Sequence, residues 1–537
     1  MSKPSQPYVV DLQFRGHVEG LTYFDEESKP LCRYFGGVPY ALPPLGPFRF
    51  QKPRSLPTCY RYGTRVNPAR FTGSCGLCPQ PAPRGTNGEN DSEWDEDCLQ
   101  SNVWVPVGEP PIGGWPVLFW IHGGFLQFGS PNGLDFRAFL SSSPCKCIVV
   151  APAYRLSLFG FLGSATLASL PDFDTNLGFW DQRMALQWTH ENISYFGGNA
   201  SNITLAGYSA GSHSVFHQLA YDLGMQGKKA IVKRAMMLSN GPGVQPKTLD
   251  EAQDQYTSLL TALNIPLSLP PRDQLSLLRS TPAKTLIRAS NTLKLHQFRA
   301  VTDASFVQPN LLASLSNGSF ASRMESRNMH LLLGECSDEH FVYGTWHPPS
   351  PGYDAMQNRL AADYPMSVCR VLMQHYFPSG SLPPKYTSWQ QAFGHVYADV
   401  QIHHLLRGMV KELVHSGAGE LVHRYRIEWR AGCVDQMLPR EWGVTHTSDM
   451  PIWFWGNGAR LTGAEEEVIK TAFQEPLRKF LEGGEMGWGA RGMEVRTLKN
   501  DGRVVVEDDE ARIKEGLELW EKVKNVGKMG AARESKL

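Results

Sequence analysis

Five consecutive residues, Gly207-Tyr208-Ser209-Ala210-Gly211, restrict the architectures open to this chain, and they directly follow the apolar run 203–206. Gly-x-Ser-x-Gly is typical of a strand that turns sharply into a helix, with the serine at the apex. Small residues must flank that serine because the turn crowds the backbone on both sides. In a chain with 51 glycines, the pattern alone is a weak signal. The prediction therefore also depends on the strand-like run before it and the helix-compatible residues 212–216 after it.

Short, almost wholly apolar runs recur along the chain. Strands that are buried on both faces of a largely parallel sheet have this composition. Residues 179–196 lie between two such runs, and Trp180, Met184 and Trp188 form a stripe there at helical spacing. The sequence therefore predicts an α/β fold, with a largely parallel central sheet and helices on both faces. The predicted strands are 117–121, 147–151, 203–206, 234–238 and 329–333.

The C-terminal part of the chain offers local signals but no domain boundary. Thr462 and Glu465 match a capping box and predict the start of a helix, which we expect Pro476 to kink. Residues 483–509 have weak periodicity and alternating charge, so we expect an exposed hairpin or an irregular insertion. Because no linker or change of composition divides the chain, we expect one domain over residues 1–537.

Charge and composition argue against several classes of partner. Lys+Arg and Asp+Glu both total 52, for a formal net charge of zero, and this balance gives no support to a nucleic-acid or anionic-membrane partner. No run of about 18 apolar residues suggests a membrane span. The ten cysteines do not form a zinc pattern, although Cys75 and Cys78 make one C-x-x-C. We expect neither a metal nor a cofactor.

The two ends of the chain bear on localisation. The N-terminus is polar and proline-rich, without the apolar segment of a secretory signal peptide. Ser535, Lys536 and Leu537 match the peroxisomal address, and they follow a basic run, 528–533, that we expect to be flexible. We therefore expect delivery to the peroxisome through an import receptor, with the cytoplasm as the alternative.

A serine at such a turn needs a histidine base and an orienting carboxylate, in the chain order serine, acid, histidine. Glu339 follows the apolar run 329–333, and loops after sheet strands are where α/β proteins collect site residues. His446 lies farther along, among glycine and small polar residues. Position alone does not select it, because sixteen histidines compete.

Several further segments share one family pattern with the serine turn: 37–44, 49–50, 96–99, 102–103, 176–178, 181–186, 192–193 and 196–198. Over nearly its full length the chain thus resembles the type-B carboxylesterase/cholinesterase family of α/β hydrolases. The resemblance implies an α/β-hydrolase fold. It also implies that Asp338-Glu339 falls at the family's acid and His446 at its base.

The roles that the resemblance implies are those of a catalytic triad. Ser209 Oγ attacks an ester carbonyl, His446 moves the proton, and Glu339 holds the other ring nitrogen. Ser239 matches a family position where a serine supports the histidine and the acid.

The segment expected to stabilise the oxyanion departs from the family. A third glycine is common where this chain has Phe125 after Gly123 and Gly124. The backbone N–H survives that replacement, so Gly124, Phe125 and Ala210 can still donate. We expect the phenyl ring on the acyl side of the pocket, where it alters acyl preference without abolishing activity.

The resemblance also implies a Cys78–Cys98 disulfide. Peroxisomal proteins fold in the reducing cytosol, so we expect the two thiols to be close together but mostly reduced. Cholinesterases bind quaternary ammonium through a tryptophan in the corresponding loop. Here only Trp94 lies between the two cysteines, next to the closing motif, so choline esters are disfavoured.

The predicted function is a serine carboxylic-ester hydrolase that acts through an acyl-enzyme on a small or medium, largely apolar ester. One alternative uses the same triad in a thioesterase or acyltransferase of a peroxisomal biosynthetic pathway. The other is a catalytically silent binding protein, because this fold also serves as an adhesion module. Such proteins usually lose the serine, whereas this chain has Ser209, Glu339 and His446.

Overall fold

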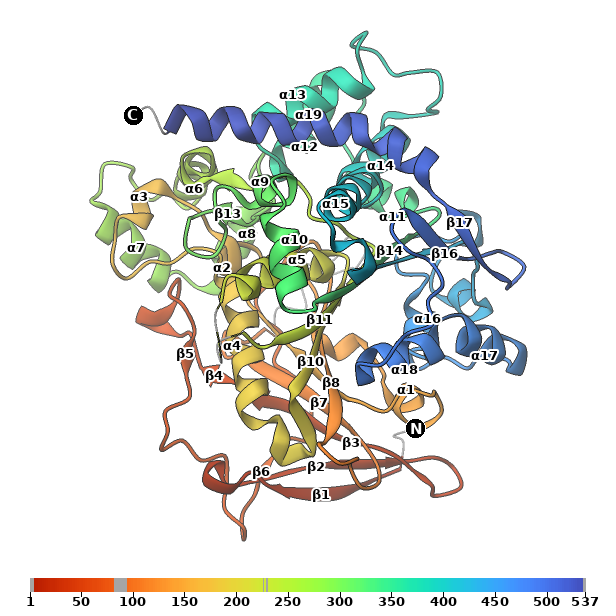
Figure 1. Cartoon of the computed structure of the whole chain (residues 1–537). Helices are drawn as coiled ribbons and strands as arrows, with labels where there is room; N and C mark the ends of the chain where they lie inside the picture. The colour runs from red at the N-terminus through yellow and green to blue at the C-terminus, as the bar shows by residue number, and fades with distance from the viewer. Residues whose placement is uncertain (1–3, 82–93, 226, 228–229, 535–537) are drawn as a thin grey trace.

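The computed structural model describes residues 4–81, 94–225, 227 and 230–534, and a twisted sheet runs through their centre (Figure 1). In spatial order, its strands within the described residues are β1 (Ser5–Asp11), β2 (His17–Phe24), β3 (Pro30–Pro39), β7 (Gln100–Pro106), β9 (Ile148–Pro152), β8 (Trp115–Ile121), β10 (Gly198–Tyr208), β11 (Val232–Leu238), β14 (His330–Cys336), β15 (Val422–Ile427), β16 (Glu494–Leu498) and β17 (Val504–Asp508), with β6 (Ala69–Arg70) beside β2.

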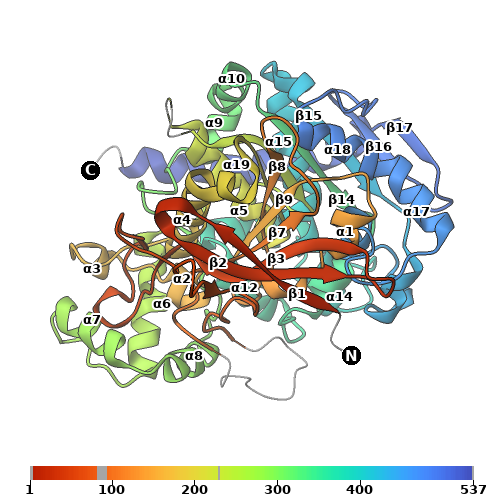
Figure 2. The same cartoon turned by 90° about the horizontal axis from the view of Figure 1, so that it is seen from below.

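Parallel pairing dominates the middle of this sheet. Every neighbouring pair from β9 to β16 is parallel. Antiparallel pairs occur at the two edges, among β1, β2, β3, β7 and β9 and between β16 and β17. In Figure 2 the antiparallel strands β1, β2 and β3 lie in front of the parallel ones. The predicted largely parallel sheet is confirmed.

All five predicted strands are present, as β8, β9, β10, β11 and β14 in the middle of the sheet. Alternate residues of these strands face two separate hydrophobic cores. Phe119 and Leu205 belong to one core, whereas Leu118 and Ala206 belong to the other. Because both faces are buried, these strands have continuous apolar runs instead of an apolar–polar alternation.

Helices cover both faces of the sheet (Figure 1). α4 (Leu177–Asn192) and α5 (Ala210–Leu223) pack on β10 and on each other. They share one core with α15 (His404–His415) and α19 (Glu510–Glu534). The opposite core includes α1 (Arg137–Ser141), α16 (Met450–Trp453), α17 (Gly463–Ile469) and α18 (Glu475–Glu482).

The remaining helices lie in the connections. They are α2 (Ser157–Phe161), α3 (Ala165–Ala168), α6 (Leu249–Ala262), α7 (Pro271–Ser280), α8 (Ala283–Asn291), α9 (Leu311–Ser316), α10 (Ser319–Ser326), α11 (His340–Thr345), α12 (Tyr353–Asp363), α13 (Met366–Tyr376) and α14 (Trp389–Ala398). None of the helices in the described part of the chain is both long and apolar enough to cross a bilayer.

The helix predicted after Thr462 is present but divided. The Thr462 side chain accepts a hydrogen bond from the Glu465 N–H, and the Glu465 carboxylate accepts one from the Thr462 N–H, so the capping box is confirmed. A π-helical segment, 470–474, then separates α17 from α18. Pro476 lies in the first turn of α18, directly after the π-helical segment and within one continuous helical run, so its missing N–H falls where the hydrogen-bond pattern changes. The expected kink is therefore a change of helix type before the proline.

Two expectations about the C-terminal part need correction. The hairpin expected within residues 483–509 is present as β16–β17, but it is exposed mainly along β17, because β16 pairs with β15 and buries Val495, Thr497 and Leu498. The run 528–533 is not flexible coil, since α19 continues through it to Glu534. The three residues of the predicted peroxisomal address lie outside the described residues.

Candidate active site

The predicted serine lies at a strained turn between β10 and α5. Ser209 has φ 55° and ψ −128°, and positive φ is unfavourable for any residue with a side chain. A Cβ atom at Gly207 would lie 2.6 Å from the backbone of Gly211, and one at Gly211 would lie 2.1 Å from the Ile121 carbonyl oxygen. Both glycines of the motif are therefore needed to bring the chain so close to β8.

The predicted acid and base form a buried pair at the carboxyl-terminal edge of the sheet. His446 Nδ1 lies 2.6 Å from Glu339 Oε2. The other carboxylate oxygen, Glu339 Oε1, accepts a hydrogen bond from the Cys336 N–H at 2.8 Å. The Glu339 side chain is fully buried and that of His446 is 3 % exposed. The second ring nitrogen, His446 Nε2, is buried and has no partner among the described residues.

Two reciprocal hydrogen bonds join the acid-bearing loop to the histidine-bearing loop. The Asp338 N–H donates to the Val444 carbonyl oxygen, and the Val444 N–H donates to Asp338 Oδ2, each at 3.0 Å. Gly443 lies against the same carboxylate with φ 56°, and a Cβ atom there would lie 2.7 Å from Asp338 Oδ2. The resemblance placed Asp338 beside the acid without a role of its own, and these contacts hold the loops of Glu339 and His446 together.

Aromatic side chains connect the histidine with the serine turn. The Tyr208 ring centroid is 6.0 Å from that of His446. The Tyr343 ring centroid, from α11, is 4.9 Å from that of His446. Burial raises the pKa of Tyr343 well above its ordinary value, Glu339 and Tyr397 raise it further, and the nearby Ser209 hydroxyl opposes them. Tyr343 therefore neighbours Ser209, Glu339 and His446 together, and no sequence motif marked it.

The predicted oxyanion donors have free N–H groups. Among the described residues, no backbone hydrogen bond uses the N–H of Gly124 or Phe125, and Ala210 is the first residue of α5, where N–H groups lack intrahelical partners. Gly124 has φ 108°, and a Cβ atom there would meet a carbonyl oxygen at 1.9 Å. A Cβ atom at Gly123 would lie 3.0 Å from the Ser209 Cβ. This turn thus lies directly beside the serine.

The Phe125 ring packs inside the site. Phe125 is 9 % exposed and has φ 59°. Glycine, the residue common at this position in the family, adopts this left-handed conformation without strain. Its ring stacks on Trp346 at 4.5 Å and meets Tyr343 edge-on at 5.9 Å. Since Tyr343 neighbours both Ser209 and His446, the ring lies where it can contact a bound acyl group. Its effect on acyl preference stays a prediction.

A second buried carboxyl, which sequence reasoning missed, lies three residues after His446. Burial and then the negative charge of Glu339 raise the pKa of Asp449 to about 6, against the opposing effect of His446. Trp453 Nε1 donates to Asp449 Oδ2 at 3.1 Å. Only the short spacing from the histidine could have pointed to Asp449.

Ser239 makes no hydrogen bond with the acid or the histidine among the described residues. It has φ 50° and is fully buried at the end of β11. Its neighbours are Cys336 and Tyr425, whose pKa values it lowers against the larger effect of burial. The supporting role of Ser239 therefore stays a prediction.

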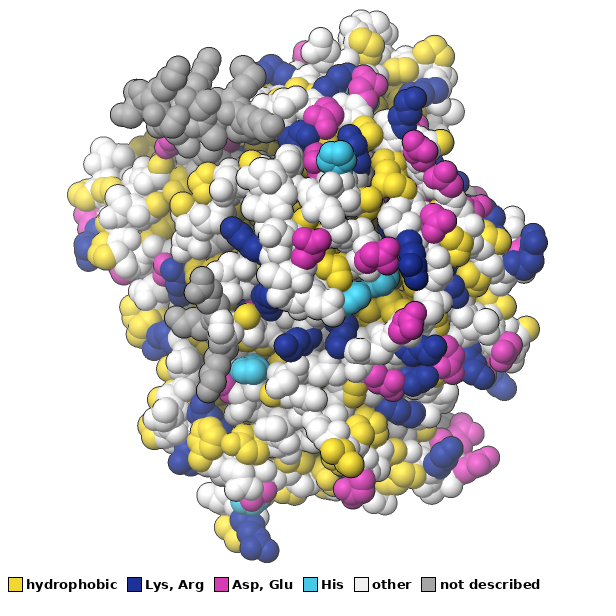
Figure 3. All heavy atoms as spheres, viewed as in Figure 1, with side chains coloured by type: hydrophobic (Ala, Val, Ile, Leu, Met, Phe, Trp, Pro, Cys, Tyr) yellow, Lys and Arg dark blue, Asp and Glu magenta, His cyan; other side chains and the backbone are white. Residues whose placement is uncertain are grey.

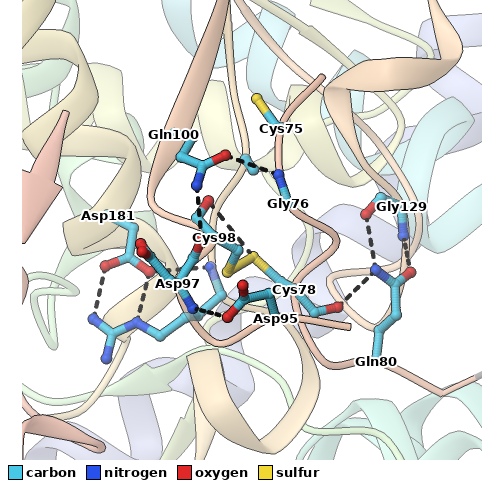
Figure 4. Close-up of a disulfide and its surroundings, with 12 residues drawn as sticks. Cys75, Gly76, Cys78, Gln80, Asp95, Asp97, Cys98, Gln100, Gly129 and Asp181 are labelled. Atoms are coloured by element: carbon cyan, nitrogen blue, oxygen red, sulfur yellow. Dashed lines mark hydrogen bonds and ion pairs between the residues drawn. A yellow bond between two sulfur atoms is a disulfide. The ribbon is translucent and has the colours of Figure 1, made fainter. Parts of the chain in front are cut away.

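The expectation that Cys78 and Cys98 stay reduced is wrong in this structure. Their Cα atoms are 5.2 Å apart and a disulfide joins them (Figure 4). That spacing lies within the range a disulfide bridges, whereas the expectation rested on the compartment alone. Gln80 Nε2 donates to the carbonyl oxygens of Cys78 and Gly129, and the Gly129 N–H donates back to Gln80 Oε1. The disulfide loop is thus tied to the segment that carries Gly124 and Phe125.

A cavity of about 610 Å³ lies at the amino-terminal ends of β11, β14 and β15, the edge of the sheet opposite to His446. Arg234, His330 and His423 line it, and none of the candidate catalytic residues does. On the face in Figure 3, basic and acidic side chains lie interspersed. In the part of the chain that the structure describes, no group of three or more His, Cys, Asp or Glu could hold a metal ion.

Comparisons with known proteins agree on the family. The carboxylesterase family model matches residues 6–487. A carboxylic ester hydrolase from Gibberella moniliformis is 44% identical over 98% of this chain and 97% of its own length. An uncharacterized esterase/lipase from Schizosaccharomyces pombe is 37% identical over 94% of this chain and 95% of its own.

The crystal structure of Aspergillus niger EstA has the same fold. It superposes with a TM-score of 0.75 at 21% identity and covers 97% of this chain and 99% of that chain. With the serine turn, the buried acid–histidine pair and a family model that spans nearly the whole sequence, the chain belongs to the carboxylesterase family of α/β hydrolases and is a carboxylic ester hydrolase.

Proposed function

We propose that this protein is a serine hydrolase of carboxylic esters that forms an acyl-enzyme on Ser209. The observation that carries the proposal is the 2.6 Å contact between His446 Nδ1 and the buried Glu339 carboxylate. Because that contact engages Nδ1, the unpartnered Nε2 is the nitrogen left to accept a proton.

Each proposed step follows from these positions. Ser209 Oγ attacks the ester carbonyl while His446 Nε2 takes its proton, and Glu339 stabilises the imidazolium that forms. The N–H groups of Gly124, Phe125 and Ala210 donate to the oxyanion, each contributing about 3 kcal/mol of transition-state stabilisation. His446 then gives the proton to the leaving alcohol. A water molecule, activated by the same nitrogen, releases the acid and regenerates Ser209.

We further propose that the substrate is a small or medium, largely apolar ester. Aromatic rings of Phe125, Tyr343 and Trp346 surround the side of the site where the acyl group would lie. The relatives reported above are named as hydrolases or esterases, and nothing in the site favours an acyl-CoA thioester, an acyl acceptor or a silent binding role.

A labelling experiment tests the serine mechanism. The enzyme is treated with an organophosphonate, digested and analysed by mass spectrometry, beside Ser209→Ala. We expect one adduct, on the peptide that contains Ser209, and loss of p-nitrophenyl ester turnover in step with labelling. Ser209→Ala should take up no label and show no turnover while it unfolds at the same urea concentration. Labelling elsewhere with Ser209 unmodified would refute the mechanism.

We also propose a peroxisomal destination, which rests on Ser535, Lys536 and Leu537 alone. A fluorescent protein fused to the N-terminus should give punctate signal that overlaps a peroxisomal marker. Deleting the three residues should make the signal diffuse. Diffuse signal from the intact fusion would contradict the proposal and would remove the reason for expecting reduced thiols at Cys78 and Cys98.

A further inference from the structure

Two buried polar groups in the aromatic part of the site, the Tyr343 hydroxyl and Trp346 Nε1, have no hydrogen-bond partner among the described residues, and the proposed mechanism does not use them. Tyr343 lies one helical turn after Glu339, on α11, and is 1 % exposed. Its ring contacts the rings of His446, Phe125 and Tyr397, with centroids 4.9, 5.9 and 5.1 Å away. The ring is therefore held on three sides, and its hydroxyl has a fixed direction.

The Tyr343 hydroxyl is buried and makes no hydrogen bond with any described residue. Ser209 lowers the pKa of Tyr343 as a hydrogen-bonding neighbour, against the larger opposing effect of burial, but the two hydroxyls lie outside normal hydrogen-bond distance or angle in this structure. The neighbouring tyrosines differ in this respect. Tyr397 accepts a hydrogen bond from Arg299, and Tyr364 accepts one from Gln401.

A buried donor without a partner is unfavourable, and a ligand that supplies an acceptor removes the penalty. Because Tyr343 packs against Phe125 and neighbours Ser209, a bound acyl group would lie against it. A hydrocarbon acyl chain would leave the buried hydroxyl without a partner. An acyl chain with an oxygen near the carbonyl would accept a hydrogen bond from the Tyr343 hydroxyl.

We propose that the acyl subsite selects esters whose acyl group carries a hydrogen-bond acceptor, such as an ether, hydroxyl or keto oxygen, within two atoms of the carbonyl carbon. The Tyr343 O–H donates to that oxygen, while Phe125 and Trp346 pack on the rest of the acyl group. This inference rests on the proposed serine-ester mechanism and narrows its substrate class to those small, largely apolar esters whose acyl group carries one such oxygen.

Two esters of nearly equal shape test the inference: p-nitrophenyl butyrate and p-nitrophenyl methoxyacetate. They differ by one CH₂ replaced by oxygen, and they share a leaving group. The quantity measured is the ratio of kcat/KM for methoxyacetate to that for butyrate, in wild type and in Tyr343→Phe. Dividing the wild-type ratio by the variant ratio cancels the different intrinsic reactivities of the esters.

We expect the wild-type ratio to exceed the Tyr343→Phe ratio by about 5- to 150-fold, the range for one buried donor gaining or losing its partner. Tyr397→Phe is the matched control, since it removes a hydroxyl from the same cluster that already has a protein partner. Its ratio should equal that of wild type. The rate of phosphonate labelling at Ser209 checks that each variant is folded with its nucleophile competent.

Two outcomes would overturn the inference while leaving the serine mechanism intact. Equal losses for both esters in Tyr343→Phe would mean that the hydroxyl acts on Ser209 or on an intermediate common to all substrates. Unchanged kinetics for both esters would mean that the hydroxyl does not meet the acyl group. If wild type hydrolyses neither ester and Ser209 takes no label, the proposed function fails and the inference fails with it.

Discussion

Replacing Phe125 by glycine separates its packing role from its proposed effect on substrate. The ring is buried, stacks on Trp346 at 4.5 Å and meets Tyr343 at 5.9 Å, so its removal should destabilise the fold by about 3–5 kcal/mol. The positive φ of 59° at this position opposes that loss, because glycine relieves about 1–2 kcal/mol of backbone strain there. Glycine also destabilises the fold by about 0.5–1 kcal/mol, because its backbone has more conformational freedom in the unfolded chain. The net loss of unfolding free energy should be about 1.5–5 kcal/mol.

The same substitution should change acyl preference. The space left by the ring opens beside Tyr343, so kcat/KM for bulky acyl groups should rise relative to that for acetate by about 5- to 150-fold, the worth of a small steric change in an apolar pocket. The assay pairs urea unfolding with a series of p-nitrophenyl esters of increasing acyl length. The N–H that we assign to the oxyanion is present in both proteins, so activity on acetate should persist.

Phe128→Leu provides the control for this experiment. Phe128 also contacts Trp346, at 4.9 Å, and it lies 6.1 Å from Phe125, but its ring makes no contact with the Tyr343 ring among the described residues. Phe128→Leu should have a lower free energy of unfolding than wild type, but kcat/KM should depend on acyl length almost as it does in wild type. A change in Phe125→Gly that is identical for every acyl length would refute the reasoning, because the ring would then point away from the acyl group.

Glu339→Gln should lower kcat by about 10⁴-fold, as loss of the orienting acid does in related triads. Asp338→Asn weakens the hydrogen bonds that the Asp338 carboxylate accepts from Val444 and Ser337, and it should lower kcat by about 10²-fold or less. Equal losses of kcat in the two variants would contradict the separate roles. The pKa of Asp449 in the folded state, about 6, lies above its ordinary value of 3.8, so the folded protein binds the carboxyl proton more tightly than the unfolded chain does. The free energy of unfolding should therefore fall as pH rises from about 4 through 6. In Asp449→Asn this pH-dependent fall should be smaller by up to about 3 kcal/mol. If the urea midpoints of variant and wild type change equally between pH 4 and 7, the prediction is wrong. Reducing the Cys78–Cys98 disulfide, which joins residues 20 positions apart, should lower the free energy of unfolding by about 3 kcal/mol. The double variant Cys78→Ser, Cys98→Ser should be as stable as the reduced wild type. A urea midpoint that dithiothreitol does not change would contradict this stabilisation.

Local sequence patterns predicted the parts of the fold whose causes are local. The apolar runs in β8 to β14 follow from burial on both faces, and the capping box at Thr462 follows from two contacts within four residues. The hairpin β16–β17 shows the limit. Its weak periodicity is visible in the sequence, but its place at the edge of the main sheet depends on pairing with β15, some 70 residues earlier in the chain.

The candidate site shows the same division between local and distant causes. Ser209 could be chosen because glycines at 207 and 211 are required by contacts within a few residues and with β8. Glu339 and His446 needed the family pattern, since 107 positions separate them. That these residues are catalytic stays a prediction, although the structure brings the acid and the histidine into contact.

What no pattern could supply is the geometry between loops. Gly443 must be glycine because Asp338, more than a hundred residues earlier, occupies the space that a side chain would need. Likewise, Tyr343 differs from an ordinary buried tyrosine only because Ser209, Phe125 and His446 surround it. Residues whose importance lies in contacts across the sheet edge have no signature in their own neighbourhood of the sequence. The motifs therefore predict the chemistry of a carboxylic ester hydrolase, whereas its substrate preference is set by contacts that only the folded chain brings together.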